Sequence, residues 1–370
     1  MGSRHTGRVT APLLLEPLAL RGATARNRVW LAPMCQYRAT DGIADDWHLV
    51  HLGARAHGGF GLLVTEATAV VPEGRITAQD VGLWSDAHVS AWTRVLAPVH
   101  DAGALAAVQL AHAGRKASTF RPWAAGRGTV PVGEGGWPTL GPSPVAFEGY
   151  RAPQEMTTDQ IGDVIAQFAE AAGRAHRAGF DAVEVHAAHG YLLHQFLSPL
   201  SNHRTDGYGG PLEARARLLR EVVAAVRAAW PDDKPVLVRL SATDWVPGGL
   251  EVDDVAAVAA SLAPLGADLV DVSSGGNVPA AFATGPGYQV PFARRVREVT
   301  GLPVSAVGMI TTGAQAEQVL LEGAADAVML GRSALRDPMW PLRAAHELGV
   351  AASTEGGAPW PAPYLRGTWG

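Results

Sequence analysis

The sequence of 370 residues has one cysteine, Cys35, and no long hydrophobic run. A single cysteine excludes an intrachain disulfide framework, a cysteine-rich zinc site and a cysteine-ligated iron–sulfur cluster within one chain. The longest nearly charge-free stretch, residues 255–267, contains Pro264. It is shorter than the ~20 apolar residues that span a bilayer. The apolar patch near the N-terminus ends at Glu16, too early for a signal-peptide core. We therefore expect a soluble, cytoplasmic protein.

An excess of positive charge is also missing. The chain has 30 basic and 35 acidic side chains, a net charge of −5. It therefore offers no electrostatic footprint for nucleic acid or for an anionic membrane, and we expect neither as a partner. Hydrophobic residues make up 47% and charged residues 18% of the chain. This composition supplies a large core and gives no case for disorder.

Short apolar runs alternate with amphipathic stretches from about residue 28 onward, and the alternation can be counted. Eight runs read as buried strands: residues 28–34, 61–65, 105–110, 182–186, 236–240, 268–273, 304–307 and 327–330. Eight helical patterns follow them, at residues 47–56, 85–102, 158–178, 211–229, 252–265, 286–299, 314–322 and 335–348. Several of these helices end before a glycine that can form the left-handed cap: Gly103, Gly179, Gly266, Gly301 and Gly323.

Strict alternation of strands and helices predicts parallel strands joined by right-handed crossovers, and eight such units close into a (β/α)8 TIM barrel. A doubly wound open sheet is the alternative. It is weakened because no G-x-G-x-x-G follows the first strand. We predict one barrel domain over residues 13–350, after a flexible tail of residues 1–12 and before a C-terminal tail of residues 351–370.

Two segments fall outside the repeat. Residues 13–28 are expected to form a short hairpin around Arg21 and Gly22 that covers the bottom of the barrel. Residues 120–153, rich in Gly, Pro and Trp, form a long insertion after the third strand. An insertion at that point lies on the face where barrel enzymes carry their active sites, so it is expected to shape the edge of the pocket.

The last two strands of the repeat both end in glycine, at Gly308 and Gly331. The loops after these strands form the usual phosphate site of barrel enzymes, and glycine lets the backbone approach an anion closely. Arg332 is placed to add a bidentate contact. These residues therefore predict a phosphate site; tight turns without a ligand are the alternative.

The segment H-A-A-H-G-Y places His186, His189 and Tyr191 at the end of the fourth strand. One interpretation is a pair of N–H donors to a carbonyl oxygen, with Tyr191 as an acid that is protonated at neutral pH. A second adds His194 to form the metal site of a hydrolase, with Glu184 deeper in the barrel. A third treats the histidines as satisfied core residues.

Arg239 ends the fifth strand at the barrel mouth, where a permanent charge is costly to bury without an anionic partner. A ligand that becomes negative would supply that partner. A salt bridge to Asp244 or to another carboxylate is the alternative. Cys35 can also be read as a small apolar side chain, which is the commoner role of a free cysteine.

Taken together, these residues resemble the old yellow enzyme family of flavin-dependent ene-reductases, and specifically its cysteine-containing, thermophilic-like bacterial branch. The resemblance covers nearly the whole chain. It rests on the ordered motifs APMCQY, VQLAHAGRKA, GFDAVEVHAAHGYLLHQFLSPLSNHRTDGYGG, VRLSATDW, AVGMI and GRSALRDP.

The resemblance implies FMN, bound without a covalent link at the C-terminal face of the barrel. Position by position, the implied cofactor-binding residues are Ala32, Pro33, Met34, Cys35, Ala67, Gln109, His186, Arg239, Gly308, Met309, Gly331 and Arg332. In this family-based picture Cys35 modulates the flavin potential. Arg239 gains an anionic partner, because the reduced flavin is negative near N1.

The resemblance also implies a reaction in two halves. NADPH, with NADH as the alternative, reduces FMN and is replaced by an α,β-unsaturated aldehyde, ketone or imide. His186 and His189 polarise the oxygen of this acceptor, flavin N5 delivers hydride to the β carbon, and Tyr191 protonates the α carbon. Tyr37 is implied as a further substrate contact.

The C-terminal sequence Y-L-R-G, residues 364–367, resembles the family's tail, whose arginine reaches the active site of a neighbouring subunit. The resemblance thus implies Arg366 as a substrate contact and a homodimer or a dimer of dimers. Dienoyl-CoA or amine-oxidising relatives are another candidate class, but they use an iron–sulfur cluster, for which one cysteine leaves no ligands. A ligand-binding barrel without turnover completes the alternatives.

Overall fold

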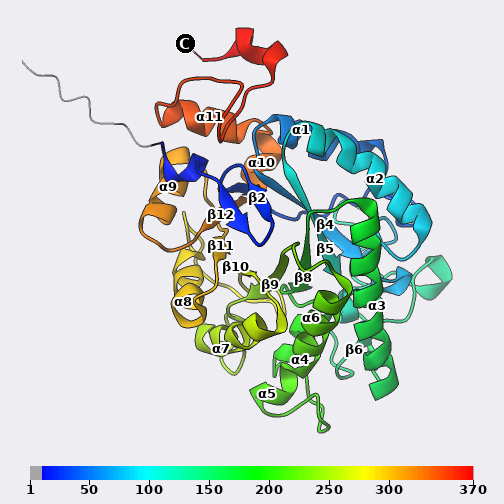
Figure 1. Ribbon diagram of the computed structural model, residues 1–370. Coiled ribbons are helices and arrows are strands. Elements are labelled where there is room, and N and C mark those ends of the chain that lie inside the picture. The colour runs from blue at the N-terminus through cyan, green and yellow to red at the C-terminus, as the bar shows by residue number, and fades with distance from the viewer. Residues whose placement is uncertain (1–10, 370) are drawn as a thin grey trace, which may run out of the picture.

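Eight short segments supply the strands of one closed parallel barrel in the computed structural model, which describes residues 11–369 (Figure 1). The strands are β3 (Val29–Leu31), β4 (Leu62–Ala69), β5 (Leu105–Ala111), β8 (Ala182–Ala187), β9 (Val236–Ser241), β10 (Leu269–Ser273), β11 (Val304–Ala306) and β12 (Ala327–Leu330). They pair in chain order, and β12 pairs with β3 to close the ring. The TIM-barrel prediction and its eight strands are confirmed. Of the predicted N-terminal tail, residues 1–10 lie outside the described part of the chain.

Helices cover the outside of the barrel. They are α1 (Asp46–His57), α2 (Asp86–Asp101), α3 (Thr158–Ala178), α4 (Leu192–Leu197), α5 (Leu212–Arg215), α6 (Arg217–Ala229), α7 (Val252–Leu262), α8 (Val290–Thr300), α9 (Gly313–Leu321), α10 (Arg332–Arg336) and α11 (Trp340–Glu347). The five predicted cap glycines all have positive φ. No helix among residues 11–369 is long and apolar enough to cross a membrane.

Proline explains two departures from the predicted helices. The pattern over residues 335–348 is two helices, because α10 ends before Pro338 and α11 begins after it. Proline disfavours helical backbone in the residue before it and has no N–H to donate. The pattern over residues 252–265 ends as α-helix at Leu262 and continues as a 3-10 turn that contains Pro264.

Two further helix predictions need correction, and one helix was not predicted. The pattern over residues 211–229 is interrupted at Ala216, between α5 and α6. The helix predicted from residue 286 begins at Val290, because Gly287 adopts a φ of 73° and the preceding residues form turns. The short helix α4 after the H-A-A-H-G-Y segment was not predicted.

Side chains along the strands alternate between two apolar clusters. Outward-facing residues such as Val183 and Val238 belong to the large core between barrel and helices. Inward-facing residues such as Ala182 and Leu237 belong to a second cluster inside the barrel. The predicted hairpin is present, with β1 (Leu18–Leu20) antiparallel to β2 (Ala23–Ala25). Leu20 and Ala25 join the inner cluster, so the hairpin closes the bottom of the barrel as expected.

The barrel interior changes from apolar to polar within one step of the pleat. Two residues beyond the inner apolar cluster, towards the C-terminal ends of the strands, the inward positions are Gln109, Glu184, Arg239 and Asp271. All four are buried. The barrel therefore has an apolar lower half and a polar upper half, and the upper half lies beneath the mouth.

The insertion of residues 120–153 reaches the mouth of the barrel. The ring of Trp123 packs edge-on against Tyr37, with centroids 5.5 Å apart. Two short strands, β6 (Leu140–Gly141) and β7 (Gln154–Glu155), pair at the end of the insertion, and β6 contacts α4 and the turn after β5. At the other end of the chain, the exposed segment Ala362–Gly367 lies beyond α11 (Figure 1).

Candidate active site

The two histidines of the H-A-A-H-G-Y segment face each other at the barrel mouth. His186 lies on β8, and His189 lies in the following turn with a φ of 58°. Positive φ is uncommon for a residue with a side chain, so this turn is held by its surroundings. The backbone N–H of His189 donates to Ser241 Oγ at 2.9 Å. Gly190 has no room for a side chain, because a Cβ there would lie 2.2 Å from the Gly276 carbonyl oxygen.

Hydrogen bonds at the far side of each ring indicate which nitrogen carries the proton. The Ala188 N–H donates to His186 Nδ1 at 3.3 Å, so His186 Nε2 carries the proton. His189 Nε2 lies 2.7 Å from Ser273 Oγ, and either group can be the donor; in the tautomer in which the hydroxyl donates, His189 carries its proton on Nδ1. These two inner nitrogens, His186 Nε2 and His189 Nδ1, are 3.5 Å apart. In that tautomer of His189 the pair points two N–H groups at a single oxygen atom.

Burial keeps this pair uncharged. Burial, followed by the positive charge of Arg239, lowers the pKa of both His186 and His189 well below 6.5. Tyr191 packs edge-on against His186, with ring centroids 5.0 Å apart. Burial raises the pKa of Tyr191 well above 10. At neutral pH the site thus contains two neutral imidazoles and a protonated phenol.

Lys116, which lies in the loop after β5, stabilises the same turn. Its ammonium group donates to the carbonyl oxygens of His189 and Gly276, at 2.9 and 3.0 Å. It also lies 5.0 Å from the centre of the Tyr191 ring, within the range of a cation–π contact. The motif V-Q-L-A-H-A-G-R-K-A contains this lysine, although sequence reasoning assigned it no role.

The polar layer beneath the histidines contains two contacts between neighbouring strands. Arg239 on β9 forms an ion pair with Asp271 on β10, with Nε and Oδ2 2.9 Å apart. These two residues are direct partners in the strand register. Of the two carboxylate partners offered as the alternative to an anionic ligand, Asp244 is wrong and another carboxylate, Asp271, is the one observed. Gln109 Nε2 donates to Glu184 Oε1 at 2.7 Å between the neighbouring strands β5 and β8.

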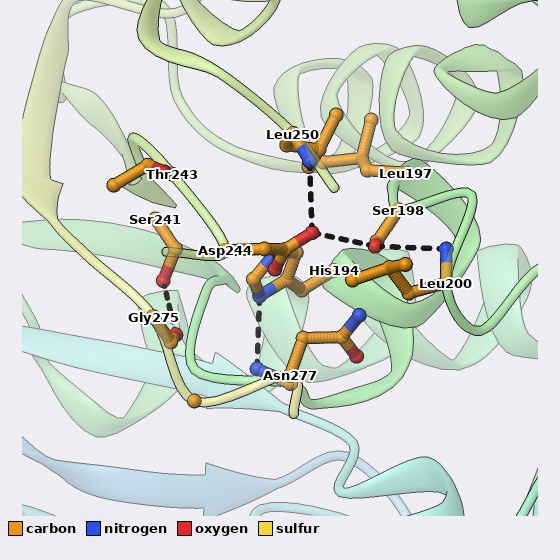
Figure 2. A network of polar contacts seen from close by, with 12 residues as sticks. His194, Leu197, Ser198, Leu200, Ser241, Thr243, Asp244, Leu250, Gly275 and Asn277 are labelled. Carbon is orange, nitrogen blue, oxygen red and sulfur yellow. Dashed lines mark hydrogen bonds and ion pairs between the residues drawn. The ribbon is translucent and has the colours of Figure 1, made fainter. Parts of the chain in front are cut away.

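Asp244 instead belongs to a buried network outside the histidine pair (Figure 2). Its carboxylate lies 3.1 Å from His194 Nε2 and accepts hydrogen bonds from Ser198 Oγ and the Leu250 N–H. The other nitrogen of His194, Nδ1, accepts from the Gly190 N–H at 2.9 Å. Both ring nitrogens of His194 are thus occupied, and this histidine anchors the turn that carries His189.

The metal-site interpretation is consequently not supported. His194 faces Asp244, and Glu184 lies lower in the barrel against Gln109. Among residues 11–369, no group of three or more histidine, cysteine, aspartate and glutamate side chains is arranged to hold a metal ion.

A cavity of about 310 Å³ opens beside the ends of β11 and β12. It brings together Gly308, Met309, Gly331, Arg332, Arg336 and Arg239, and its lining contains no carboxylate side chain. Neither Arg332 nor Arg336 forms an ion pair with any other described residue. A basic cavity with free guanidinium groups fits a phosphate. The predicted phosphate residues therefore share one cavity.

Arg336 was missed by sequence reasoning. It stands four residues after Arg332 on α10 and so lies on the same face of that helix. This spacing was a usable signal. Gln289 and Tyr288, which also line the cavity, precede α8 in a turn, and no sequence pattern indicated their position.

The loop after β3 lies next to the end of β12, because β3 and β12 are neighbours in the barrel. It contains Ala32, Pro33, Met34, Cys35 and Tyr37. The N–H of Gln36 in this loop donates to Glu66 Oε2 at 2.8 Å, which ties the loop to β4. Loss of solvation raises the pKa of Cys35 well above 9.0, so it is a thiol at neutral pH.

Two further predicted positions stand in register on neighbouring strands, while one lies apart. Ala67 on β4 pairs directly with Gln109 on β5, next to a bulge in β4. Arg366 lies on the exposed C-terminal segment beyond α11 (Figure 1), so a single chain does not bring it among the other predicted residues.

The fold and the site together define a barrel oxidoreductase that uses a flavin. The chain belongs to the NADH:flavin oxidoreductase / NADH oxidase family, whose family model matches residues 13–350. The cofactor is FMN, and the basic cavity beside β11 and β12 fits its phosphate.

Curated relatives match along nearly their whole length. The chain is 46% identical over 358 residues to an NADPH dehydrogenase of Geobacillus thermodenitrificans, covering 96% of this chain and 98% of the relative. It is also 46% identical over 338 residues to an NADPH dehydrogenase of Bacillus pumilus, covering 90% and 95% respectively.

Solved structures show the same architecture. Morphinone reductase superposes with a TM-score of 0.77 at 29% identity, over 93% of this chain and 92% of its own. An old yellow enzyme homologue from Zymomonas mobilis gives a TM-score of 0.75 at 28% identity, over 92% and 94%. A 2-naphthoyl-CoA reductase gives a TM-score of 0.82 at 27% identity, over 91% of this chain and 52% of its own. The expected relation to the old yellow enzymes is confirmed.

Proposed function

We propose that the protein is an NADPH-dependent ene-reductase, which saturates the C=C bond of α,β-unsaturated carbonyl compounds. The observation that carries this proposal is the convergence of His186 Nε2 and His189 Nδ1, 3.5 Å apart, beside the partly buried phenol of Tyr191. Relatives named as NADPH dehydrogenases support NADPH as the reductant.

The residues proposed to hold FMN line the mouth from both sides. The loop after β3 and the ends of β4 and β5 supply one wall, and the basic cavity supplies the phosphate contacts. The proposed set is Ala32, Pro33, Met34, Cys35, Ala67, Gln109, His186, Arg239, Gly308, Met309, Gly331 and Arg332. When bound, FMN supplies the hydride that is added to the β carbon of the substrate.

The histidine pair is proposed to bind the carbonyl oxygen of the substrate. Two N–H donors on one oxygen withdraw electron density from the conjugated bond and stabilise the negative charge that develops on that oxygen. Since His186 and His189 are neutral, they donate hydrogen bonds without giving up a proton. The pair therefore orients and activates the acceptor.

Tyr191 is proposed to deliver the proton to the α carbon. Its raised pKa keeps the proton on the phenol until the α carbon becomes basic. Tyr37, with Trp123 against its ring, is proposed to bound the substrate pocket. We also propose that Arg366 of a neighbouring subunit completes the pocket, which requires a homodimer or a dimer of dimers.

Product analysis under anaerobic conditions tests this function. The holoenzyme is mixed with NADPH and a simple cyclic enone, and the products are identified by mass spectrometry. We expect the saturated ketone in equal amount to the NADPH consumed. If no saturated ketone forms and NADPH is consumed only after oxygen is admitted, the proposal is contradicted.

A further inference from the structure

Glu184 is a buried acid for which the proposed reaction has no use. It lies on β8 two residues before His186, and its side chain is fully buried. One carboxyl oxygen, Oε1, accepts a hydrogen bond from Gln109 Nε2 at 2.7 Å. The other, Oε2, has no hydrogen-bond partner among the described residues. A buried polar atom without a partner is costly and usually has a functional reason.

The charges around Glu184 do not balance. From β10, Asp271 presents a second carboxylate, and from β9, Arg239 presents the single guanidinium group. Arg239 is already paired with Asp271, which also accepts from Ser305 Oγ at 2.9 Å. The neighbour on β5, Gln109, is uncharged, and His186 on β8 is neutral. One cation therefore faces two carboxyl groups, and Glu184 is the one without an ion pair.

This imbalance favours a proton on Glu184. Burial, followed by the negative charge of Asp271, raises the pKa of Glu184 to about 8, while Arg239 lowers it in part. At neutral pH the Arg239–Asp271 pair is then balanced and Glu184 is a neutral acid. Above this pKa, an uncompensated negative charge appears in the layer beneath the mouth.

We propose that Glu184 is a positioning residue that couples one proton to the redox state of the flavin. This inference rests on the proposed function, in which Gln109 and Arg239 contact the flavin ring. Bound FMN would gain negative charge on reduction, and that charge would disfavour a second negative charge on Glu184. Glu184 in its carboxylate form then takes a proton from water at Oε2, where a new O–H bond forms. Reoxidation releases the proton, and no electron passes through Glu184.

The same contact fixes the orientation of Gln109. Because Gln109 Nε2 donates to Glu184, the amide oxygen of Gln109 is free to accept a hydrogen bond from an N–H of the flavin ring. The carboxyl oxygen Oε1 accepts this bond whether or not Oε2 is protonated. Glu184→Gln retains an acceptor at the same place and removes the ionisable proton, which makes it the appropriate variant.

The midpoint potential of bound FMN, measured from about pH 6 to about pH 10, tests the coupling. In the wild-type holoenzyme, we expect the midpoint potential to fall more steeply with pH above about pH 8. The steeper slope should correspond to the uptake of one additional proton for every two electrons. Glu184→Gln should match the wild type at lower pH and lack the steeper segment. Asp253→Asn, which changes a surface carboxylate that pairs with Arg295, should keep the wild-type profile. Identical profiles in wild type and Glu184→Gln would overturn the proposal, as would a shift of equal size at every pH.

Infrared difference spectroscopy of the wild type provides a measurement that needs no variant. At about pH 9, the reduced-minus-oxidised spectrum should gain the C=O band of a protonated carboxyl group. Absence of that band overturns the coupling even if Glu184→Gln fails to fold. Wild-type protein that neither contains nor takes up FMN would instead refute the proposed function, so the two failures are distinguishable.

Discussion

The two halves of the barrel interior differ in composition although they are built from the same strands. In the lower half, inward positions such as Ala182, Leu237 and Leu269 form an apolar cluster. Two residues further along the same strands, the inward positions are Glu184, Arg239 and Asp271. Burial of the lower half stabilises the fold by about 25 cal/mol for each Å² of apolar surface removed from water. Buried charges bring no such gain on their own. The upper half is where the sequence departs from what stability alone requires, and that is where the site lies.

Arg239 and Asp271 illustrate what this difference teaches. Replacing a buried ion pair by apolar residues of similar size is often neutral or stabilising. The pair is instead explained by its position at the edge of the basic cavity. The lower half thus contributes to stability and the upper half to the proposed chemistry, so variants in the two halves should have separable effects.

Tyr191→Phe should have the largest effect, and it should be on the chemistry alone. Loss of the hydroxyl removes the proposed proton donor and should slow reoxidation by an enone about a hundredfold or more. Reduction by NADPH and FMN content should be unchanged, because the ring still packs against His186. Stopped-flow absorbance of each half-reaction measures this, and an unchanged rate of reoxidation would remove Tyr191 from its proposed role.

Leu237→Ala should have the opposite signature in the lower half. It leaves a cavity in the inner apolar cluster and should lower the free energy of unfolding by about 2–5 kcal/mol. Urea denaturation followed by circular dichroism measures this change. Leu321→Ala is the matched control, since Leu321 is 63% exposed, and it should change stability little. Equal losses from both substitutions would mean that the lower half does not carry the stability we assign to it.

Arg332→Ala should weaken FMN binding roughly tenfold to a hundredfold, as expected for the loss of a charge-assisted contact worth about 1.5–3 kcal/mol. Its guanidinium group has no ion-pair partner among the described residues, so stability without FMN should change little. Fluorescence titration of the apoprotein with FMN gives the dissociation constant. Arg294→Ala, at a surface ion pair, is the control. The account of the cavity fails if Arg332→Ala and Arg294→Ala bind FMN equally well.

Glu184→Gln should change stability less than Leu237→Ala does. The direction of the change with pH follows from the pKa of Glu184. Burial raises the pKa of Glu184 from its ordinary value near 4.5 to about 8. Between these values the unfolded chain has released the proton and the folded chain retains it, so wild-type stability falls as pH rises. Glutamine has no such proton. The melting temperature of Glu184→Gln relative to wild type should therefore increase from about pH 5 to about pH 8. A difference in melting temperature that is constant or decreases with pH would show that Glu184 is ionised in the folded protein.

Much of the fold could be predicted because it depends on local pattern. Apolar runs, amphipathic stretches and cap glycines located all eight barrel strands and the hairpin at Arg21 and Gly22. The helix break at Pro338 was equally local and was overlooked. The insertion was placed at the mouth, but the contact of Trp123 with Tyr37 depends on a long loop that follows no repeat.

The candidate site was predictable to the extent that strand ends meet at one face of a barrel. That rule brought Gly308, Gly331 and Arg332 into one cavity. Pairing between strands was not predictable, because the partner of Arg239 is set by the register of β9 and β10. His194 was misjudged for a similar reason, since its partner Asp244 lies 50 residues away in the chain and is brought near only by the fold. The domain bounds, the roles of the site residues and the contact of Arg366 with a neighbouring subunit stay predictions.

A comparison of FMN with riboflavin tests the central claim most directly. The purified protein is examined for bound flavin by its visible absorption spectrum, stripped, and titrated with each compound. We predict a yellow protein that binds FMN much more tightly than riboflavin, because only FMN places a phosphate among Arg332 and the glycine-ended strands. A colourless protein that takes up neither compound, or one that binds both equally, would contradict the assignment of the barrel mouth.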